Sequence, residues 1–377
     1  MDFGIPTEVR DLEKRVGLTP AAVVSLVAAG HRVFIQRDAG ADAGFRDEHY
    51  EQAGARIVYT ADEAYGRADV VLKVARPTAA EHTLFRTNQV IMSFFHLTVA
   101  STDLVAALAE KEVTAIAYEV MEEPDGRLPV LLPMSETAGR LAPVFAGQLL
   151  TNTAGGRGIL LSGLPGVARA IVIIVGAGSL GRSAARAFVG TGAQVIVLDN
   201  NVDRLNQVDT MFNGTVTTMM ANRYNIDRVV GFADVLVGAV LLKGQRAPVL
   251  ITREMVRKMR PGSVVMDFSI DQGGCIETSR PMTLRDPTFV AEGVIHFCVP
   301  NLPAAVARTS SHALTNALLP YIKSLAECGL ECALRDFPAL HAGVKMYQGK
   351  VVSHRLAEAL GREIEFDLNA ALESLPK

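Results

Sequence analysis

Two residues, His96 and Asp271, stand where they could do acid–base chemistry. Each follows an apolar run of strand length, 90–95 for His96 and 264–270 for Asp271, so each should emerge at the carboxyl edge of a sheet, where ligands bind. Histidine, with an ordinary pKa of about 6.5, can give or take a proton near neutrality, and aspartate can accept a proton or orient water. The structural alternatives are a satisfied core histidine and a solvated turn aspartate.

Arg15 and Lys73 are the cations that could serve an acidic substrate. Arg15 closes the charged run 11–15, and a guanidinium can hold a carboxylate with two parallel hydrogen bonds, although an ordinary solvated charge is the alternative. Lys73 lies inside the apolar run 70–74. An ammonium group there is costly unless it reaches a partner or a cleft, and the sequence leaves both open.

A dinucleotide fingerprint occupies the middle of the chain. The apolar run 171–175 leads directly into Gly176-Ala-Gly-Ser-Leu-Gly181, and a helical pattern follows. In this arrangement Gly176 permits the tight turn, Gly178 lets the backbone approach a pyrophosphate, and Gly181 allows the helix to pack closely on the strand. The phosphates would face the positive end of the helix. Turn glycines with no ligand are the alternative.

Asp199 completes this fingerprint, because it ends a second strand, 194–198, where an acid can accept hydrogen bonds from an adenosine ribose. The carboxylate would repel a 2′-phosphate, so it favours NAD over NADP. Arg204, somewhat more than one helical turn further on, could moderate that preference.

Short apolar runs alternate with helical patterns along the chain, which predicts α/β architecture with parallel sheets. The first series covers about 125 residues, with strands expected at 3–6, 32–36, 70–74, 89–96 and 114–120 and a helix at 20–29. A long helix, 135–150, then leads to a second alternating series that runs from 171 to about 299. Helices are expected at 309–334 and 354–360. This C-terminal part of the chain is too short to build a core alone, so it should pack back onto the first domain.

Composition excludes several classes of protein. Hydrophobic residues make up 49% of the 377 residues and charged residues 20%, as in a folded globular chain. The net charge of -3 leaves no excess of positive charge for nucleic acid. No apolar run approaches the roughly 20 residues of a membrane span, and the N-terminus lacks a secretory pattern, so we expect a cytoplasmic protein. The four cysteines are expected to be small buried hydrophobes.

Together these segments resemble the alanine dehydrogenase and nicotinamide nucleotide transhydrogenase superfamily, in particular its alanine dehydrogenase branch. The resemblance covers almost the whole chain. It is carried by Gly4-Ile-Pro-Thr-Glu8, Arg15, His96-Leu97, Leu132-Pro-Met-Ser-Glu136, Gly155-Gly-Arg-Gly158, Gly176 to Gly181, Ile270-Asp-Gln-Gly-Gly-Cys275, Asn301-Leu-Pro303, Arg308-Thr-Ser310 and Ala313-Leu-Thr-Asn316.

The resemblance implies two Rossmann-like domains, of which the first is discontinuous: a substrate domain (1–134 and 305–377) and an NAD-binding domain (135–304). It also implies a homohexamer and NAD-dependent, reversible deamination of L-alanine to pyruvate and ammonium. Arg15 would hold the substrate carboxylate, and His96 and Asp271 would carry the acid–base steps. The residues near NAD would be Ser135, Gly176, Gly178, Ser179, Leu180, Gly181, Asp199, Arg204, Val240, Leu241 and Asn301.

One departure bears on the substrate. Members of the branch typically read Lys-Val-Lys-Glu-Pro where this chain has Lys73-Val-Ala-Arg-Pro77, so the second lysine, which helps to bind the substrate, is Ala75 here. Lys73 lies on the same face of the strand, about 6.6 Å away along it, and could partly cover the gap. Alternatively, the pocket takes a different amino acid or turns alanine over weakly.

Two other functions stay open. The transhydrogenase branch also lacks lysine at position 75, so the chain could be the nucleotide-binding subunit of a proton-translocating transhydrogenase. Against this, Asp271 follows the dehydrogenase pattern, where transhydrogenases typically have Glu. A non-catalytic NAD-binding protein is the third possibility, and the presence of Arg15, His96 and Asp271 argues against it.

Overall fold

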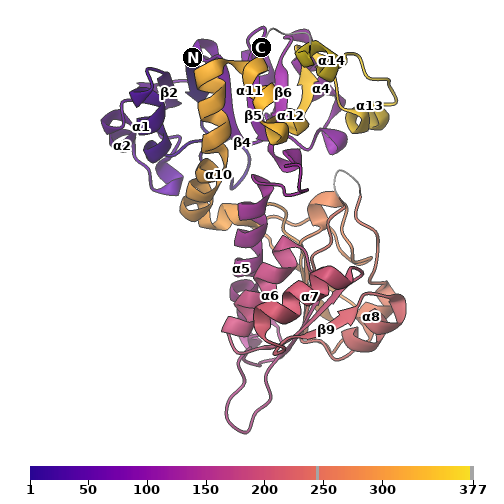
Figure 1. Ribbon diagram of the computed structural model, residues 1–377. Helices are drawn as coiled ribbons and strands as arrows, with labels where there is room; N and C mark the ends of the chain where they lie inside the picture. The colour runs from indigo at the N-terminus through magenta and orange to yellow at the C-terminus, as the bar shows by residue number, and fades with distance from the viewer. Residues whose placement is uncertain (243–245, 374–377) are drawn as a thin grey trace. The chain divides into compact units, whose positions relative to one another are not determined.

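The computed structural model describes residues 1–242 and 246–373, and the chain divides into two compact units (Figure 1). Unit 1 contains Met1–Met134 and the chain from Ala304 onward, and unit 2 contains Ser135–Pro303. Each unit is built around its own mostly parallel sheet. The predicted fold class, two Rossmann-like α/β domains of which the first is discontinuous, is confirmed.

The sheet of unit 1 has eight strands in the order β15-β14-β6-β5-β4-β1-β2-β3. All neighbouring strands are parallel except at one edge, where β14 runs antiparallel to β6 and β15 to β14. Every residue of β4, β5 and β6 is buried, as expected for strands covered on both faces. The strands are β1 (Asp2–Ile5), β2 (Arg32–Gln36), β3 (Arg56–Val58), β4 (Val70–Ala75), β5 (Val90–Phe94), β6 (Thr114–Ala117), β14 (Val344–Tyr347) and β15 (Lys350–Val351).

The helices of unit 1 come from both ends of the chain. They are α1 (Pro20–Ala28), α2 (Asp47–Gln52), α3 (Ala61–Arg67), α4 (Thr102–Glu110), α10 (Ala307–Cys328), α11 (Leu330–Asp336), α12 (Pro338–Gly343), α13 (His354–Leu360) and α14 (Leu368–Glu373). Helix α10 is joined to the N-terminal segment by side-chain acceptors: the Val16 amide donates to Ser311 Oγ (3.0 Å) and the Thr19 amide to Thr315 Oγ1 (3.1 Å). The C-terminal segment therefore completes the first core.

The stretch 309–334, predicted to be mainly helical, lies in two helices, α10 and α11. Gly329 adopts φ +86°, a conformation that ends α10 and starts α11. The prediction that all four cysteines are buried is wrong for two of them.

Cys275 and Cys298 are buried, but Cys328 is exposed and Cys332 is half-buried. Cys328 and Cys332 lie on either side of Gly329, and a disulfide joins them.

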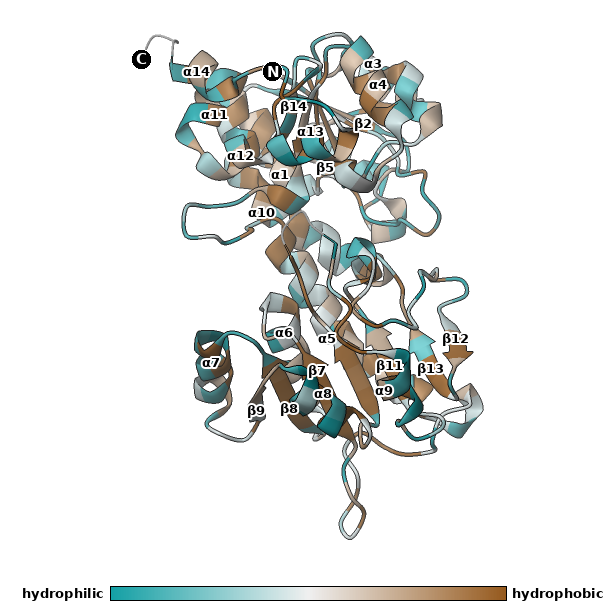
Figure 2. Cartoon of the chain, turned by 90° about the vertical axis from the view of Figure 1, so that its right-hand side faces the viewer, coloured by the Kyte–Doolittle hydropathy of each residue, from teal (hydrophilic) through white to brown (hydrophobic). Residues whose placement is uncertain are grey.

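The sheet of unit 2 has seven strands in the order β12-β13-β11-β10-β7-β8-β9, parallel except for β12. Figure 2 shows β7, β8 and β11 as hydrophobic strands and many hydrophilic residues along α7, α8 and α9. The strands are β7 (Ile171–Val175), β8 (Gln194–Asp199), β9 (Thr217–Met220), β10 (Val235–Gly238), β11 (Val264–Asp267), β12 (Thr288–Ala291) and β13 (Val294–Phe297). The helices are α5 (Leu131–Leu149), α6 (Ser179–Gly190), α7 (Val202–Phe212), α8 (Arg223–Val230) and α9 (Arg253–Arg257).

Across residues 1–242 and 246–373, none of the helices combines the length and the hydropathy needed to cross a membrane.

Close packing of α3 on β1 gives a stability prediction. A Cβ on Gly4 would collide with the carbonyl oxygen of Ala64 and lie 2.7 Å from the Cβ of Ala68. Gly4→Ala should therefore lower the free energy of unfolding by about 1–3 kcal/mol, measured by urea denaturation. Gly66→Ala on α3 is the matched control, because its Cβ would meet no described atom within 4 Å and the substitution should stabilise by about 0.5–1 kcal/mol. Equal effects of the two substitutions would contradict the close contact.

Candidate functional site

The loop between β7 and α6 has the shape that a dinucleotide phosphate requires. Gly176 adopts φ +112°, and a Cβ there would collide with the carbonyl of Ala239. A Cβ on Gly181 would collide with the carbonyl of Gly176, so this glycine allows α6 to approach the strand. A Cβ on Gly178 would meet no described atom within 4 Å. Gly178 is therefore the point at which a ligand can approach the backbone, with Ser179 and Leu180 beginning the helix.

Asp199 is attached directly to this loop. It ends β8, is 5% exposed, and accepts hydrogen bonds from the Ala177 amide (2.7 Å) and the Asn201 amide (2.9 Å). Arg204 Nη1 lies 3.7 Å from Asp199 Oδ2. An ionised carboxylate offers about four acceptor positions, so two amides leave capacity for a ribose hydroxyl. These residues fit a dinucleotide.

The loops after β10 and β13 carry other predicted cofactor residues. The Val240 amide donates to Ser269 Oγ (3.0 Å), whose hydroxyl donates to the Val240 carbonyl (2.9 Å), so the loops after β10 and β11 are joined. Leu241 is 45% exposed. Asn301 is exposed and left-handed (φ +58°), and Ser135 is half-buried in α5.

Asp271 lies on a loop organised by another aspartate. Strand β11 ends at Asp267 rather than at residue 270, because the buried Asp267 carboxylate accepts hydrogen bonds from the amides of Ser269 (3.0 Å), Cys275 (3.0 Å) and Ile276 (3.1 Å). Burial raises the pKa of Asp267, and hydrogen bonds from the Ser279 side chain and from the amides of Ser269 and Ile276 oppose the rise. Asp271 is exposed in the single turn that follows. Asp267 was not among the predicted residues, although a carboxylate in an apolar run was a signal.

His96 leaves its strand in a left-handed conformation, with φ +48° and ψ +45°, so β5 ends at Phe94. Its amide donates to Glu119 Oε1 (2.6 Å), and the Phe95 amide donates to Glu119 Oε2 (3.2 Å). Both backbone donors at the end of the strand are thus satisfied by one carboxylate. The imidazole is half-buried and stacks on the Phe94 ring at 6.4 Å. Glu119 was not among the predicted residues.

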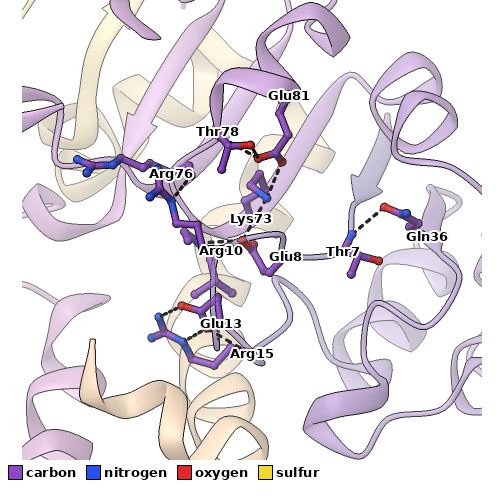
Figure 3. A network of polar contacts seen from close by, with 12 residues as sticks. Thr7, Glu8, Arg10, Glu13, Arg15, Gln36, Lys73, Arg76, Thr78 and Glu81 are labelled. Atoms are coloured by element: carbon purple, nitrogen blue, oxygen red, sulfur yellow. Dashed lines mark hydrogen bonds and ion pairs between the residues drawn. The ribbon is translucent and has the colours of Figure 1, made fainter. Parts of the chain in front are cut away.

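Arg15 is buried and already holds a carboxylate (Figure 3). Its Nε lies 2.7 Å from Glu13 Oε1 and its Nη2 lies 2.6 Å from Glu13 Oε2, which is the fork geometry that arginine offers to carboxylates. Nη1 contacts Met134 Sδ at 3.2 Å. Glu13 therefore binds the guanidinium that the sequence analysis assigns to a substrate carboxylate.

Lys73 is completely buried between two carboxylates, as Figure 3 shows. Its Nζ lies 3.1 Å from Glu8 Oε2 and 2.8 Å from Glu81 Oε1. Burial by itself would lower the pKa of Lys73, but the charges of Glu8 and Glu81 outweigh it and raise that pKa. Burial raises the pKa of Glu8 against the effect of Lys73, whereas for Glu81 the ammonium prevails over burial and the pKa is lowered.

Of the two alternatives for Lys73, a partner or a cleft, the structure therefore shows partners. The ammonium group is completely buried, and both of these partners are carboxylates of the chain itself. Ala75 ends β4 and is 9% exposed, and the carbonyl of the next residue, Arg76, accepts a hydrogen bond from Arg10 Nε (3.0 Å).

The predicted site residues form two groups. Arg15, Lys73 and His96 belong to unit 1, whereas Asp271 and the predicted cofactor residues belong to unit 2.

Comparison with known proteins identifies the family. Residues 4–138 match the family "Alanine dehydrogenase/PNT, N-terminal domain", and residues 142–354 match "Alanine dehydrogenase/PNT, C-terminal domain". The chain belongs to the alanine dehydrogenase/PNT family. The resemblance inferred from the sequence is confirmed. This family and the Rossmann-like nucleotide-binding domain imply a nicotinamide cofactor.

Individual relatives cover nearly the whole chain. The alanine dehydrogenase of Mycobacterium tuberculosis is 45% identical over 361 residues, which are 96% of this chain and 97% of that protein. The alanine dehydrogenase of Bacillus subtilis is 45% identical over 365 residues, 96% of each chain. A solved L-alanine dehydrogenase superposes with a TM-score of 0.91 at 43% identity, covering 96% of this chain and 99% of that one. The transhydrogenase from Sinorhizobium meliloti has a TM-score of 0.79 at 25% identity, covering 93% and 99%.

The buried ion pairs predict a pH-dependent loss of stability. Lys73→Met leaves Glu8 and Glu81 buried without their cation, and removing one partner of a buried pair costs about 3–5 kcal/mol. Both carboxyl pKa values would rise above their unfolded values, so the folded state would bind more protons than the unfolded state. The variant's stability should therefore fall as the pH rises, making its deficit larger at about pH 7 than at about pH 5.

Urea denaturation at the two pH values measures this effect. Lys258→Met is the control, because Lys258 forms an exposed pair with Asp227, which is worth about 0–1 kcal/mol. A Lys73→Met deficit no larger than that of Lys258→Met, or one that grows with acidity, would refute the role of the buried cluster.

Proposed function

We propose that the chain is an NAD-dependent alanine dehydrogenase that converts L-alanine, NAD⁺ and water reversibly to pyruvate, ammonium and NADH. The observation that carries this proposal is the 45% identity, over 96% of the chain, to proteins named alanine dehydrogenase. The position of Asp199 at the glycine loop supports NAD as the cofactor.

Unit 2 is proposed to hold NAD and unit 1 the substrate. Asp199 would accept hydrogen bonds from the adenosine ribose, and the backbone at Gly178 would face the pyrophosphate. When bound, NAD⁺ supplies the acceptor for the hydride that leaves the alanine Cα. The remaining proposed cofactor residues are Ser135, Gly176, Ser179, Leu180, Gly181, Arg204, Val240, Leu241 and Asn301.

Arg15 is proposed to bind the substrate carboxylate. Its guanidinium would then contact both Glu13 and the substrate, or would release Glu13. The residues present fit this role, because the guanidinium is preorganised in fork geometry toward a carboxylate. Lys73 is proposed as a positioning residue. Its ammonium holds Glu8, whose carboxylate accepts the Val74 amide (2.6 Å) and so attaches the N-terminal segment to β4.

His96 and Asp271 are proposed to carry the acid–base steps. One group would take the proton from the water that attacks the oxidised substrate carbon, and the other would return a proton to the departing amine. His96 is half-buried at a strand end and Asp271 is exposed on a loop, so each can reach solvent to exchange protons.

We also propose that the protein is a cytoplasmic homohexamer, on the basis of the family resemblance. Sedimentation of the purified chain would test the hexamer: a species of six copies is expected, and a stable monomer would refute it.

A second candidate function is the nucleotide-binding subunit of a transhydrogenase. Ala75 favours it, because the transhydrogenase branch also lacks lysine at this position. The structural similarity to the Sinorhizobium meliloti transhydrogenase is compatible with it. Hydride transfer between two nicotinamide nucleotides without any amino acid, and co-purification with a membrane partner, would support this candidate.

The proposed activity is tested by NADH formation with L-alanine and NAD⁺, and by ammonium-dependent NADH oxidation with pyruvate. Activity in both directions is expected. Turnover with another amino acid only would re-assign the substrate, and NADH binding without any turnover would refute the dehydrogenase.

Replacing His96 should separate chemistry from cofactor binding. His96→Ala should lower kcat with L-alanine by about 100- to 10,000-fold, the range for loss of a general acid–base group, while NADH binding followed by fluorescence changes little. His354→Ala is the control, because His354 is an exposed histidine at the start of α13. Unchanged turnover in His96→Ala would refute the acid–base role of His96.

Replacing Asp199 should relax the choice of cofactor. Asp199→Asn removes the charge and keeps an acceptor for the Ala177 amide, so the ratio of kcat/KM for NAD to that for NADP should fall by about 10- to 100-fold, the value of a hydrogen bond to a charged group. Asp199→Ala should do the same and also loosen the loop. Asp209→Asn, an exposed acid further along α7, should leave the ratio unchanged. A ratio that does not move in Asp199→Asn would show that the ribose contact is misassigned.

A further inference from the structure

Cys328 and Cys332 form a cysteine pair outside every residue assigned above. Cys328 is the last residue of α10 and Cys332 lies in α11, and Gly329 between the helices takes φ +86°. The two sulfurs are bonded, and the Cα atoms are 5.7 Å apart, within the usual range for a disulfide. The break between the helices therefore keeps the two thiols within bonding distance.

The two sulfurs differ in access and in their neighbours. Cys328 is exposed and lines a groove of about 470 Å³, whereas Cys332 is half-buried and does not line it. Ser324 Oγ lies 3.9 Å from Cys328 Sγ, and Asp336 Oδ2 lies 3.6 Å from Cys332 Sγ. The groove is lined by Pro320, Lys323, Ser324, Glu327, Cys328, Asp336 and Phe337.

These neighbours predict different reactivities after reduction. The Asp336 carboxylate oxygen lies 3.6 Å from Cys332 Sγ and within 4.8 Å of Cys328 Sγ, so it disfavours a negative charge on both sulfurs and most strongly on the nearer one. Only Cys328 also has the Ser324 hydroxyl beside it, which can donate to a thiolate and stabilise it. The groove also leaves room for a small molecule beside Cys328 only.

The other two cysteines are poor candidates for such chemistry. Cys275 and Cys298 are buried, and burial raises the pKa of both thiols, that of Cys298 to about 11. Thiolate is the reactive form, so these two residues should stay inert in the folded protein.

We propose that Cys328 and Cys332 form a reversible thiol–disulfide exchange site for small thiols and disulfides, in which Cys328 reacts first. In oxidation, the Cys328 thiolate attacks a small disulfide, releases one small thiolate and forms a mixed disulfide. Cys332 loses its proton and attacks Cys328 Sγ, which expels the second small thiolate and closes the protein disulfide. The protein loses two hydrogen atoms, and one small disulfide becomes two thiols.

Reduction runs through the same bonds in reverse. A small thiolate attacks Cys328 Sγ from the groove and expels Cys332 as thiolate, which is then protonated. This leaves a mixed disulfide between Cys328 and the first small thiol. A second small thiolate attacks the small-molecule sulfur of that mixed disulfide, forms the small disulfide and releases Cys328 as thiolate. The disulfide joins two helices that pack on each other, so oxidation restrains the corner between α10 and α11.

The test treats the purified full-length protein with dithiothreitol or with glutathione disulfide and then measures thiols and intact mass. The native reduced protein should show two thiols toward a chromogenic disulfide reagent, and the oxidised protein none. The oxidised protein should be lighter by two hydrogen atoms and carry no glutathione. Failure of glutathione disulfide to oxidise the pair, or disulfide-linked dimers instead of an internal bond, would overturn the proposal.

Single variants test the order of events. Cys332→Ser should keep one glutathione on Cys328, and Cys328→Ser should form its adduct about tenfold more slowly, the effect of one pKa unit on the thiolate fraction. Asp336→Asn in the Cys328→Ser background should restore much of that rate. Equal rates in the two single variants would refute the assignment of Cys328 as the first sulfur. The double variant Cys328→Ser/Cys332→Ser is the control and should take up no reagent while folded.

Discussion

A lysine buried between two glutamates holds the N-terminal segment of unit 1 against its sheet. The chain from Thr7 to Arg15 has no helix or strand, and it is attached to the sheet by polar contacts: Thr7 to Gln36, Glu8 to Lys73 and the end of β4, and Arg10 to the Arg76 carbonyl. Arg15 and Glu13 stand at the end of this chain segment. The position of the proposed carboxylate-binding group therefore depends on an ammonium group that is itself out of reach of solvent.

Carboxylates also hold the other loops, half-buried at Glu119 and buried at Asp199 and Asp267. Glu119 binds the amides that β5 leaves open before His96, Asp199 binds the glycine loop, and Asp267 binds three amides of the loop that carries Asp271. In each place backbone donors at the carboxyl end of a parallel strand need acceptors, because a buried N–H without a partner is costly. The same acids that satisfy the backbone hold the residues proposed for binding and acid–base chemistry.

The fold and the nucleotide loop could be predicted because they depend on local pattern. Apolar runs predicted the central strands, and the glycine spacing predicted a turn whose collisions now explain Gly176 and Gly181. The strand ends at Phe94 and Asp267 could not be predicted, because both depend on contacts that form only in the folded protein. At Phe94 the carboxylate comes from Glu119, and at Asp267 the loop brings the amides of Ser269, Cys275 and Ile276 to the carboxylate. For Lys73 the cost of burial was predictable, but its partners were not. Glu8 is distant in the sequence and Glu81 lies on another element, so tertiary structure decides both contacts. The break at Gly329 was missed because a single glycine inside a helical pattern does not by itself end a helix.

We propose that this chain transfers hydride from the alanine Cα to NAD⁺ although Ala75 stands where the branch has its second lysine. The most direct test uses L-alanine carrying deuterium at Cα, with mass spectrometry of the reduced cofactor. The NADH formed should carry the deuterium, and turnover should slow relative to unlabelled alanine if hydride transfer limits the rate. NADH that forms without deuterium, or NADH binding with no cofactor reduction by alanine at all, would contradict it.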